Sequence, residues 1–454
     1  MPHRSWLPVW VLPLTLLLSA CSTFDHADGG LADRAEADRS EVAAWPALSE
    51  AENAGSLDAL IPSDNLAALV HEALVANPGL RQTWLTLRTR QAELRQTTGD
   101  RWPGLEAGLS GSRDENAAAS YTGSVSIDWE VDLWGKLADE QAAAMADVAE
   151  EQGLYQSARD TLAGEVMSAW VGLIAQRRAV AIQSRRLETL KTNQALIIDQ
   201  YRAGLGSLED LDTARSNVAS ARATLEEQRE TLAQRRRSLA EMLGRSSAER
   251  IAVPDDFPET LLVRPELPEQ TLARRPDLQA AYAAIEAAER RTDVAYKDLL
   301  PSLDVTAALE DVAETPHEAL LGDPLWSLLG QLTAPLFQGG RLKAAADIAE
   351  LEAAQAYQAY RETLLEAVGE VQDAIGFETS LARRQADTAE ALASARRSLG
   401  QYTERYRAGL VDLVDLLDVQ QQTYDLEASR NDLIESRLTN RIDLGLALGL
   451  GVNE

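Results

Sequence analysis

An internal repeat constrains the fold of this sequence more than any other feature. Pro78 recurs as Pro276, 198 positions later, and the pentapeptide Tyr-Arg-Ala-Gly-Leu at 201–205 recurs unchanged at 406–410, 205 positions later. Self-similarity at a nearly fixed period predicts two copies of one structural unit. The period grows by about seven residues along the chain. We expect these extra residues in a surface loop of the second copy, between 301 and 340.

The repeat also sets the domain boundaries. We expect the first structural repeat at 63–244 and the second at 271–454. The intervening residues, 245–270, contain Pro254, Pro258, Pro265 and Pro268. Because proline lacks a backbone N–H and clashes within a helix, this density predicts a Pro-rich linker rather than a helix.

The N-terminus carries an export signal. An apolar run at 6–18, too short to span a bilayer as a stable anchor, ends in Leu-Ser-Ala-Cys21, which resembles a bacterial lipobox. An ordinary signal peptide with a chance cysteine is the alternative, but Cys21 is the only cysteine and occupies the cleavage position. We therefore expect a lipoprotein signal peptide at 1–20, a covalent lipid on Cys21, and an extended, lipid-anchored tether at 21–62.

Composition excludes several classes of function. The chain has 72 acidic and 43 basic residues, a net charge of -29, which argues against nucleic acid as a partner. One cysteine and four scattered histidines provide neither an internal disulfide nor a zinc cluster nor a Cys/His catalytic pair. Asp415 and Asp418 are paired carboxylates, but no nucleophile or metal ligand accompanies them. We therefore predict no enzymatic activity, no bound metal, and no cofactor except the covalent lipid.

Four segments alternate between apolar and polar residues, as β-strands with two different faces do. We expect strands at about 103–112 and 121–131 in the first repeat, and at about 301–310 and 326–337 in the second. Their length of roughly ten residues fits a lipid-facing barrel wall, although a soluble sheet with one buried face has the same alternation. Aromatic residues near the strand ends favour the membrane: Trp102, Tyr121, Trp129, Trp134, Trp326 and Phe337.

Very long helices are expected after each strand pair. No proline occurs between Pro103 and Pro254 or after Pro335. From Leu133 to about Tyr201 the chain can form one helix of roughly 70 residues, about 100 Å long. Such a helix needs neighbours from the same chain and from other copies to cover its apolar positions.

Taken together, these features resemble the TolC-like outer-membrane factor family, in particular the NodT-type lipoprotein branch that serves resistance-nodulation-division (RND) efflux pumps. The resemblance rests on the lipobox, the two repeats, Arg-Arg-Pro-Asp-Leu at 274–278 and the two Tyr-Arg-Ala-Gly-Leu segments. It implies a mainly α fold with a small antiparallel β part, assembled as a homotrimer. Twelve strands would form an outer-membrane β-barrel, continued by a long periplasmic α-barrel. Four strands cannot close a barrel alone, although symmetry by itself would also permit two or four copies.

The resemblance also implies a function. The chain would be a passive exit duct in the outer membrane that carries drugs, toxic compounds or metal ions. It would receive them from an inner-membrane RND-type pump through a periplasmic membrane-fusion adaptor. Two alternatives remain: the outer-membrane component of a type I, ATP-driven polypeptide secretion system, and a lipid-anchored periplasmic coiled-coil scaffold with no strands in the membrane.

Two glycines are expected to reverse the chain at the tip of the helices. Gly204 and Gly409 follow the long helices and are expected in the left-handed conformation that ends a helix. The family resemblance places these reversals at the periplasmic tip. Gly204, Leu205, Gly409 and Leu410 are therefore candidate adaptor contacts as well as turn residues.

Three acids close to these turns are candidate gate residues. Asp210 and Asp415 stand three positions after a capping residue, Ser207 or Asp412, and so have an alternative role as first-turn acids. Asp415 and Asp418 resemble the acidic pair that the family places at the constricted tip. Capping does not explain Asp418, which makes it the stronger candidate of the three.

Overall fold

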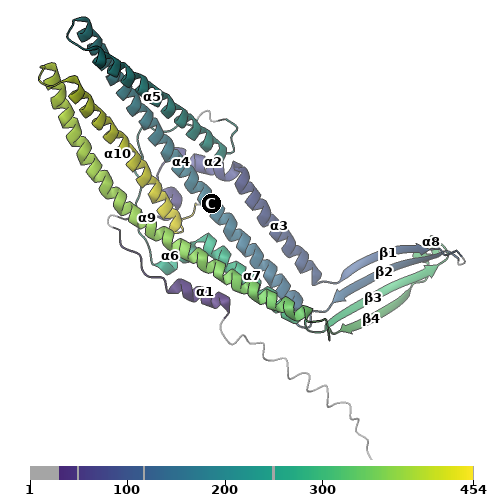
Figure 1. Ribbon diagram of the computed structural model, residues 1–454. Helices are drawn as coiled ribbons and strands as arrows, with labels where there is room; N and C mark the ends of the chain where they lie inside the picture. Colours follow the sequence, from purple (N-terminus) through teal and green to yellow (C-terminus); the bar gives the residue numbers. More distant parts are fainter. Residues whose placement is uncertain (1–29, 49–50, 116–117, 248–250, 453–454) are drawn as a thin grey trace, which may run out of the picture.

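A computed structural model describes residues 30–452, apart from 49–50, 116–117 and 248–250. It shows an elongated, mainly helical molecule with a small antiparallel sheet at one end (Figure 1). Cys21 and the expected signal peptide lie outside the described residues.

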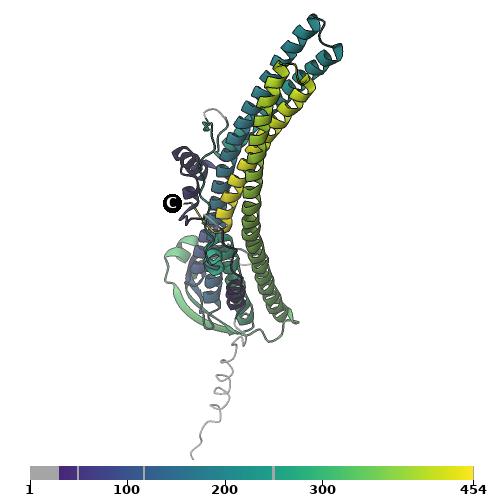
Figure 2. The same ribbon diagram turned by 90° about the vertical axis from the view of Figure 1, so that its left-hand side faces the viewer.

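Two long helical hairpins with helices of equal length contain about half of the described residues. The first pairs α4 (Lys136–Arg202) with α5 (Leu208–Met242), and the second pairs α9 (Arg341–Arg407) with α10 (Leu413–Ala447). In each hairpin the long helix has 67 residues and the return helix has 35. Viewed from the side, the long helices bend together along one curve (Figure 2).

The expected start of the first long helix, Leu133, is wrong by three residues. The helix begins at Lys136, directly after Gly135, which has a left-handed φ of 74°. The carboxylate of Asp132 accepts hydrogen bonds from the amides of Leu137 and Ala138, at 3.2 and 3.0 Å. These bonds satisfy first-turn donors that have no partner within the helix. The helix therefore begins only after the turn at Gly135.

Shorter helices complete each half. α2 (Asp64–Ala76) precedes α3 (Pro78–Asp100), and α6 (Pro268–Arg274) precedes α7 (Pro276–Lys297). Both α3 and α7 start at a proline, which suits the first helical position because its missing N–H has no partner there. Contacts place the helices side by side in the order α3, α4, α7, α9.

The four strands form a single sheet in the order β1-β2-β3-β4, antiparallel throughout. They are β1 (Gly104–Ser112), β2 (Ser120–Glu130), β3 (Ser302–Ala313) and β4 (Leu325–Thr333). The pairing of β2 with β3 joins the two halves of the chain. The expected end of the fourth strand, Phe337, is wrong: the strand stops two residues before Pro335, which cannot donate a ladder hydrogen bond.

The order of the strands matches the order of the helices. α3 leads into β1, β2 leads into α4, α7 leads into β3, and β4 leads into α9. The described part of the chain therefore has one edge made of β1 and α3 and an opposite edge made of β4 and α9.

The extra residues of the second half do not form a plain surface loop. They include a short helix, α8 (Pro316–Leu321), between β3 and β4. α8 packs on β2 at Gly123, where an added Cβ would lie 2.1 Å from the carbonyl oxygen of Ala319. Only glycine admits this approach, and the helix is therefore docked on the sheet.

The N-terminal segment and the linker are packed rather than extended. The segment contains α1 (Leu31–Ser40) and a 3₁₀ turn, η1 (Leu57–Leu60). α1 lies against α7 and α9 with Ala35 fully buried, and Leu57 and Leu60 are fully buried in the main core. The linker adds Val253 to this core and becomes helical at Pro268, within its expected bounds. A few apolar residues spaced through polar sequence are enough to dock both segments.

Candidate functional site

The sheet has one apolar face, because the register aligns the alternation of all four strands. Leu105 lies opposite Ile127, Ile127 opposite Ala307, and Ala307 opposite Leu328. Directly opposed residues share a face of the sheet. The same face carries Leu109, Val125, Trp129, Leu303, Val305, Leu309, Trp326 and Leu332.

The opposite face of the sheet is polar and acidic. Asp128 lies opposite Thr306, whose hydroxyl donates to the Asp128 carboxylate at 2.7 Å. The acids on this face are Glu106, Asp128, Glu130, Asp304 and Glu310. β3 and β4 depart from the pattern near their ends at α8. Leu325 and Leu329 of β4 and Val312 of β3 put apolar side chains on the polar face, and Asp311 of β3 lies on the apolar face, opposite Gly123. The sheet can thus separate an apolar medium from an aqueous one.

Two glycine turns close the hairpins at the opposite end of the molecule from the sheet (Figure 1). Gly204 and Gly409 have φ of 74° and 72°. In the first turn the amide of Leu205 donates to the carbonyl of Gln200 at 2.9 Å, and the second turn repeats this bond from Leu410. These bonds satisfy carbonyls at the helix end, as in a Schellman motif. The turns expected from the sequence are present.

Two leucines are exposed at these turns. Leu205 is 81% exposed and Leu410 is 68% exposed. Neither side chain belongs to a core cluster of the described residues. The two tips therefore present apolar groups to water at the end of the molecule.

The three candidate gate acids differ in their surroundings. Asp210 completes a capping box: its amide donates to the Ser207 hydroxyl at 3.0 Å, and its carboxylate accepts from the Ser207 amide at 3.3 Å. In the second hairpin the Asp415 amide donates to the Asp412 carboxylate at 3.0 Å, but no bond returns. The backbone amide of Asp412 does not donate back to Asp415, so no capping box forms there.

Asp415 and Asp418 are both exposed. Within the described part of the chain, neither carboxylate has a hydrogen bond or an ion pair. Asp415 and Asp418 therefore lie on one exposed helix face near the tip, whereas the carboxylate of Asp210 is hydrogen-bonded to Ser207.

Polar contacts between α4 and α10 were not expected from the sequence. Arg185 pairs with Glu427 at 2.8 Å, and the hydroxyls of Thr189 and Tyr424 lie 2.7 Å apart. Asn193 donates to Gln420 at 2.8 Å. The sequence of one helix does not determine how that helix is aligned along a distant one. These partners are more than 220 positions apart, so no local sequence pattern predicts their contacts.

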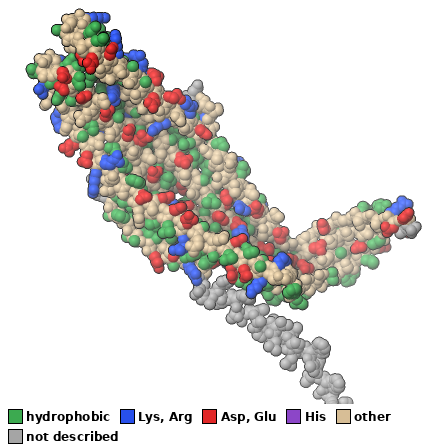
Figure 3. Space-filling model, viewed as in Figure 1, with side chains coloured by type: hydrophobic (Ala, Val, Ile, Leu, Met, Phe, Trp, Pro, Cys, Tyr) green, Lys and Arg blue, Asp and Glu red, His purple; other side chains and the backbone are tan. Residues whose placement is uncertain are grey.

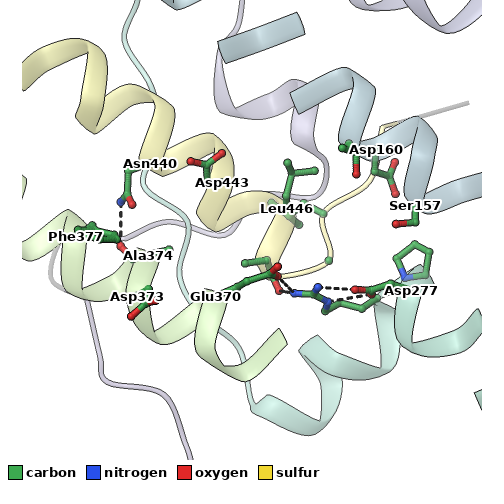
Figure 4. A pocket seen from close by; sticks show the side chains of 16 residues that line it. Ser157, Asp160, Asp277, Glu370, Asp373, Ala374, Phe377, Asn440, Asp443 and Leu446 are labelled. Atoms are coloured by element: carbon green, nitrogen blue, oxygen red, sulfur yellow. Dashed lines mark hydrogen bonds and ion pairs between the residues drawn. The ribbon is translucent and has the colours of Figure 1, made fainter. Parts of the chain in front are cut away.

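The Arg-Arg-Pro-Asp motif forms a buried clamp. Arg275 is 7% exposed and pairs with Asp277 at 2.6 Å and with Glu370 at 2.7 Å (Figure 4). It also donates to the carbonyl of Ala447 at 3.2 Å. Burial lowers the pKa of Arg275, but its bonds to Asp277 and Glu370 outweigh that effect and raise the pKa above its ordinary value. The clamp therefore ties α7 to α9 and to the end of α10.

Other acids beside this clamp are also structural. Asp160 accepts hydrogen bonds from the amide of Val452 at 3.1 Å and from Gln156 at 3.0 Å. Burial raises the pKa of Asp160.

Among the described residues, no group of three or more His, Cys, Asp or Glu side chains could hold a metal ion. None of the described helices is long and apolar enough to cross a membrane. Elsewhere on the helices, acidic and basic side chains are interspersed (Figure 3).

Comparisons with known proteins agree with this geometry. The sequence profile described as "Outer membrane efflux protein" matches residues 69–245 and 267–450. Outer membrane protein OprJ of Pseudomonas aeruginosa is 28% identical over 471 residues, which cover 98% of this chain and 96% of OprJ. Cation efflux system protein CusC of Escherichia coli is 24% identical over 398 residues, or 86% of each chain. A crystal structure of a membrane protein from Pseudomonas aeruginosa superposes with a TM-score of 0.84 at 27% identity, covering 90% of this chain and 97% of that one.

Proposed function

Because this chain belongs to the outer membrane efflux protein family, we propose that three copies of it close into the exit duct of a tripartite efflux system. The chain is an outer-membrane efflux channel protein.

The observation that carries the proposal is the pair of complementary edges. One edge of the described chain consists of β1 and α3, and the other of β4 and α9. A strand edge left open in lipid would leave backbone donors and acceptors unpaired, at a cost of several kcal/mol each. If β4 of one copy pairs with β1 of the next, the contact is head-to-tail and can close a ring. Three copies would give twelve strands, an even number within the range of outer-membrane barrels.

The two faces of the sheet support this arrangement. In a closed barrel the apolar face that contains Ile127 and Leu328 would contact lipid, and the acidic face that contains Asp128 would line the water-filled path. Transport would be passive, since a polar lumen provides a path and leaves the energy to the inner-membrane partner. The lipid-anchored scaffold is disfavoured, because it has no use for a two-faced sheet.

The far tips would meet the partners. Leu205 and Leu410 expose apolar surface where the hairpins end, and a periplasmic membrane-fusion adaptor that docks there would bury it. An inner-membrane RND-type pump would supply small molecules or metal ions through that adaptor. The name of CusC, a cation efflux protein, supports this class of cargo.

The anchor would hold the chain at the membrane end. The amide of Leu31 donates to Glu289 on α7, two turns before that helix ends near β3. Leu31 is ten positions after Cys21, and a segment of that length can span up to about 35 Å when extended. A lipid on Cys21 could therefore reach the inner leaflet while α1 stays docked.

Single-channel recording in planar bilayers tests this function. The full-length, purified protein should insert as a pore with a discrete conductance and a preference for cations, because acids line the proposed lumen. If assembled oligomers insert without any conductance, both as the natural protein and as the variant that combines Asp415→Ala with Asp418→Ala at the proposed gate, the assembly is not a duct.

A further inference from the structure

Three arginines form an exposed stripe on α3 in a strongly acidic protein. Arg81, Arg88 and Arg95 are seven positions apart, so they lie on one side of the helix. Within the described residues none of them makes an ion pair; Arg88 donates only to the neutral Gln91, at 2.9 Å. The guanidinium carbons of Arg81 and Arg88 lie 3.9 and 5.6 Å from the ring centre of Trp84. The Trp84 ring thus holds Arg81 and Arg88 in place, and none of the three arginines has a counter-charge among the described residues.

The stripe lies on the free edge of the protomer. α3 packs against α4 through Leu80 and Leu87, and α4 is its only extensive neighbour among the described helices. Leu85, on the side away from α4, is half exposed. A second helix could therefore pack along α3 and cover Leu85.

The opposite edge of the protomer carries matching acids. α9 packs on α7 through Ala353, Tyr360 and Leu364, and it exposes Leu351 and Leu365 on other sides. Exposed acids on the same free surface are Glu352, Glu362 and Glu366. In the described part of the chain, none of these three carboxylates has a hydrogen bond or an ion pair.

Contacts within one chain fix the relative heights of the two edges. Arg101, just after α3, donates to Gln141 on α4. Farther along, Asp147 on α4 accepts from Arg291 on α7 at 2.7 Å, and Tyr296 on α7 donates to Glu350 on α9.

These contacts allow residues on α3 and α9 to be matched. The two helices are antiparallel. Asp100 of α3 and Glu350 of α9 lie at about the same position along the common helix axis. At about 1.5 Å per residue, Arg95, Arg88 and Arg81 then stand within about one turn of Glu352, Glu362 and Glu366. In a ring whose axis is parallel to the helices, neighbouring copies meet at the same heights.

We propose that Arg81, Arg88 and Arg95 of α3 pair with Glu366, Glu362 and Glu352 on α9 of a second copy. The inference rests on the proposed ring and names the contacts that select the neighbour and its register. Leu85 lies between Arg81 and Arg88, and Leu365 lies between Glu362 and Glu366, so the contact would cover both leucines. A sliding or inverted neighbour would oppose like charges or leave them unpaired, which disfavours wrong registers.

Charge exchange tests the pairing. Native mass spectrometry of the full-length protein in detergent would measure the closed oligomer for three variants: Arg81→Glu with Arg88→Glu, Glu362→Arg with Glu366→Arg, and all four changes together. We expect each double variant to lower the oligomer fraction roughly tenfold or more and the fourfold variant to restore most of it. Because every interface holds one α3 and one α9, restoration within a single chain is specific to this pairing.

Arg90→Glu is the matched control. Arg90 is an exposed arginine on the same helix, but it already pairs with Glu93 at 2.9 Å within the chain. We expect it to leave the oligomer fraction unchanged. A loss as large as that of the Arg81 and Arg88 variant would overturn the pairing, and so would a fourfold variant that stays dissociated.

A crosslink tests the same contact without altering charge. Ala92 and Gln355 are exposed, uncharged and at matched heights on the two edges. Ala92→Cys with Gln355→Cys should give covalent oligomers under mild oxidation, whereas each single variant and the unmodified chain should not. Trimers by mass with no crosslink would overturn this inference and leave the proposed function standing. An unmodified chain that is monomeric would overturn both.

Discussion

At the scale of single residues, backbone conformation and side-chain chemistry determine the two tips. Gly204 and Gly409 adopt φ angles of 74° and 72°, and an added Cβ would meet no atom within 4 Å at either glycine. Alanine there would suffer only the backbone penalty of the left-handed region, without a clash.

We therefore expect Gly409→Ala to destabilise the second tip by about 1–2 kcal/mol. Hydrogen exchange of the amides around the turn should report faster local opening. Gly400→Ala is the control, because Gly400 lies inside α9 with open space around it and alanine is the better helix former. Equal effects at both positions would contradict a special role for the turn.

Asp415 and Asp418 carry a prediction about the gate. In a threefold assembly each would form a ring of three carboxylates, and neither carboxylate has a partner in the described chain. We expect Asp415→Ala with Asp418→Ala to weaken cation preference and raise resting conductance without dissociating the oligomer.

Planar-bilayer recordings of this double variant provide the measurement. Asp210→Ala is the comparison, since the Asp210 carboxylate is engaged in a capping box. It should reduce helix stability by about 0.5–2 kcal/mol and change selectivity less. Unchanged selectivity and conductance in the double variant would leave Asp415 and Asp418 as ordinary acids of a helix start.

Cys21 carries the third residue-scale prediction. Mass spectrometry of the mature protein should find an acylated N-terminal cysteine, because the apolar leader ends at the only cysteine of the chain. Cys21→Ser should impair sorting and assembly more than conduction, since in the proposed barrel the strands would also hold the protein in the membrane. An unmodified Cys21, or cleavage at another position, would contradict the anchor.

Caps and turns could be predicted from the sequence because they depend on a few consecutive residues. Ser207 and the glycine turns are of this kind. The difference between Asp210 and Asp415 could not, since it depends on which hydrogen bonds actually close. The role of Arg275 was also hidden, because Glu370 and Ala447 are about 95 and 172 positions away from it.

At the scale of elements, α8 shows how an insertion acquires structure. It lies on the sheet only because Gly123 lets the carbonyl of Ala319 approach. We expect Gly123→Val to displace α8 and to expose residues 314–324 to proteolysis. Gly330→Val on β4 is the control, since a Cβ there meets nothing within 4 Å. Equal protection of α8 in both variants would show that the helix does not depend on Gly123.

The sequence predicted the long helices and strands well, because period and proline spacing determine them locally. It placed the ends of these elements less accurately. The cap by Asp132 makes α4 begin later than expected, and β4 ends earlier than expected, two residues before Pro335. It also missed the docking of the tether, where Leu57 and Leu60 are too few to form a periodic pattern. Whether such a segment is docked or extended depends on packing against residues far away in the sequence.

At the scale of the whole molecule, the two halves share one sheet and one row of helices. The pairing of β2 with β3 bridges residues that are 174 to 192 positions apart; Val125 opposite Leu309 is one example. A repeat in the sequence cannot specify that pairing. It is this pairing that leaves β1 and β4 as the outer strands of the described sheet.

Electron cryomicroscopy of the full-length protein in detergent or nanodiscs would reveal the proposed assembly itself. We expect a threefold ring in which β4 of each copy pairs with β1 of the next, giving a twelve-stranded barrel continuous with a tube of helices. A folded monomer with both sheet edges open, or a ring with another number of copies, would contradict this assembly.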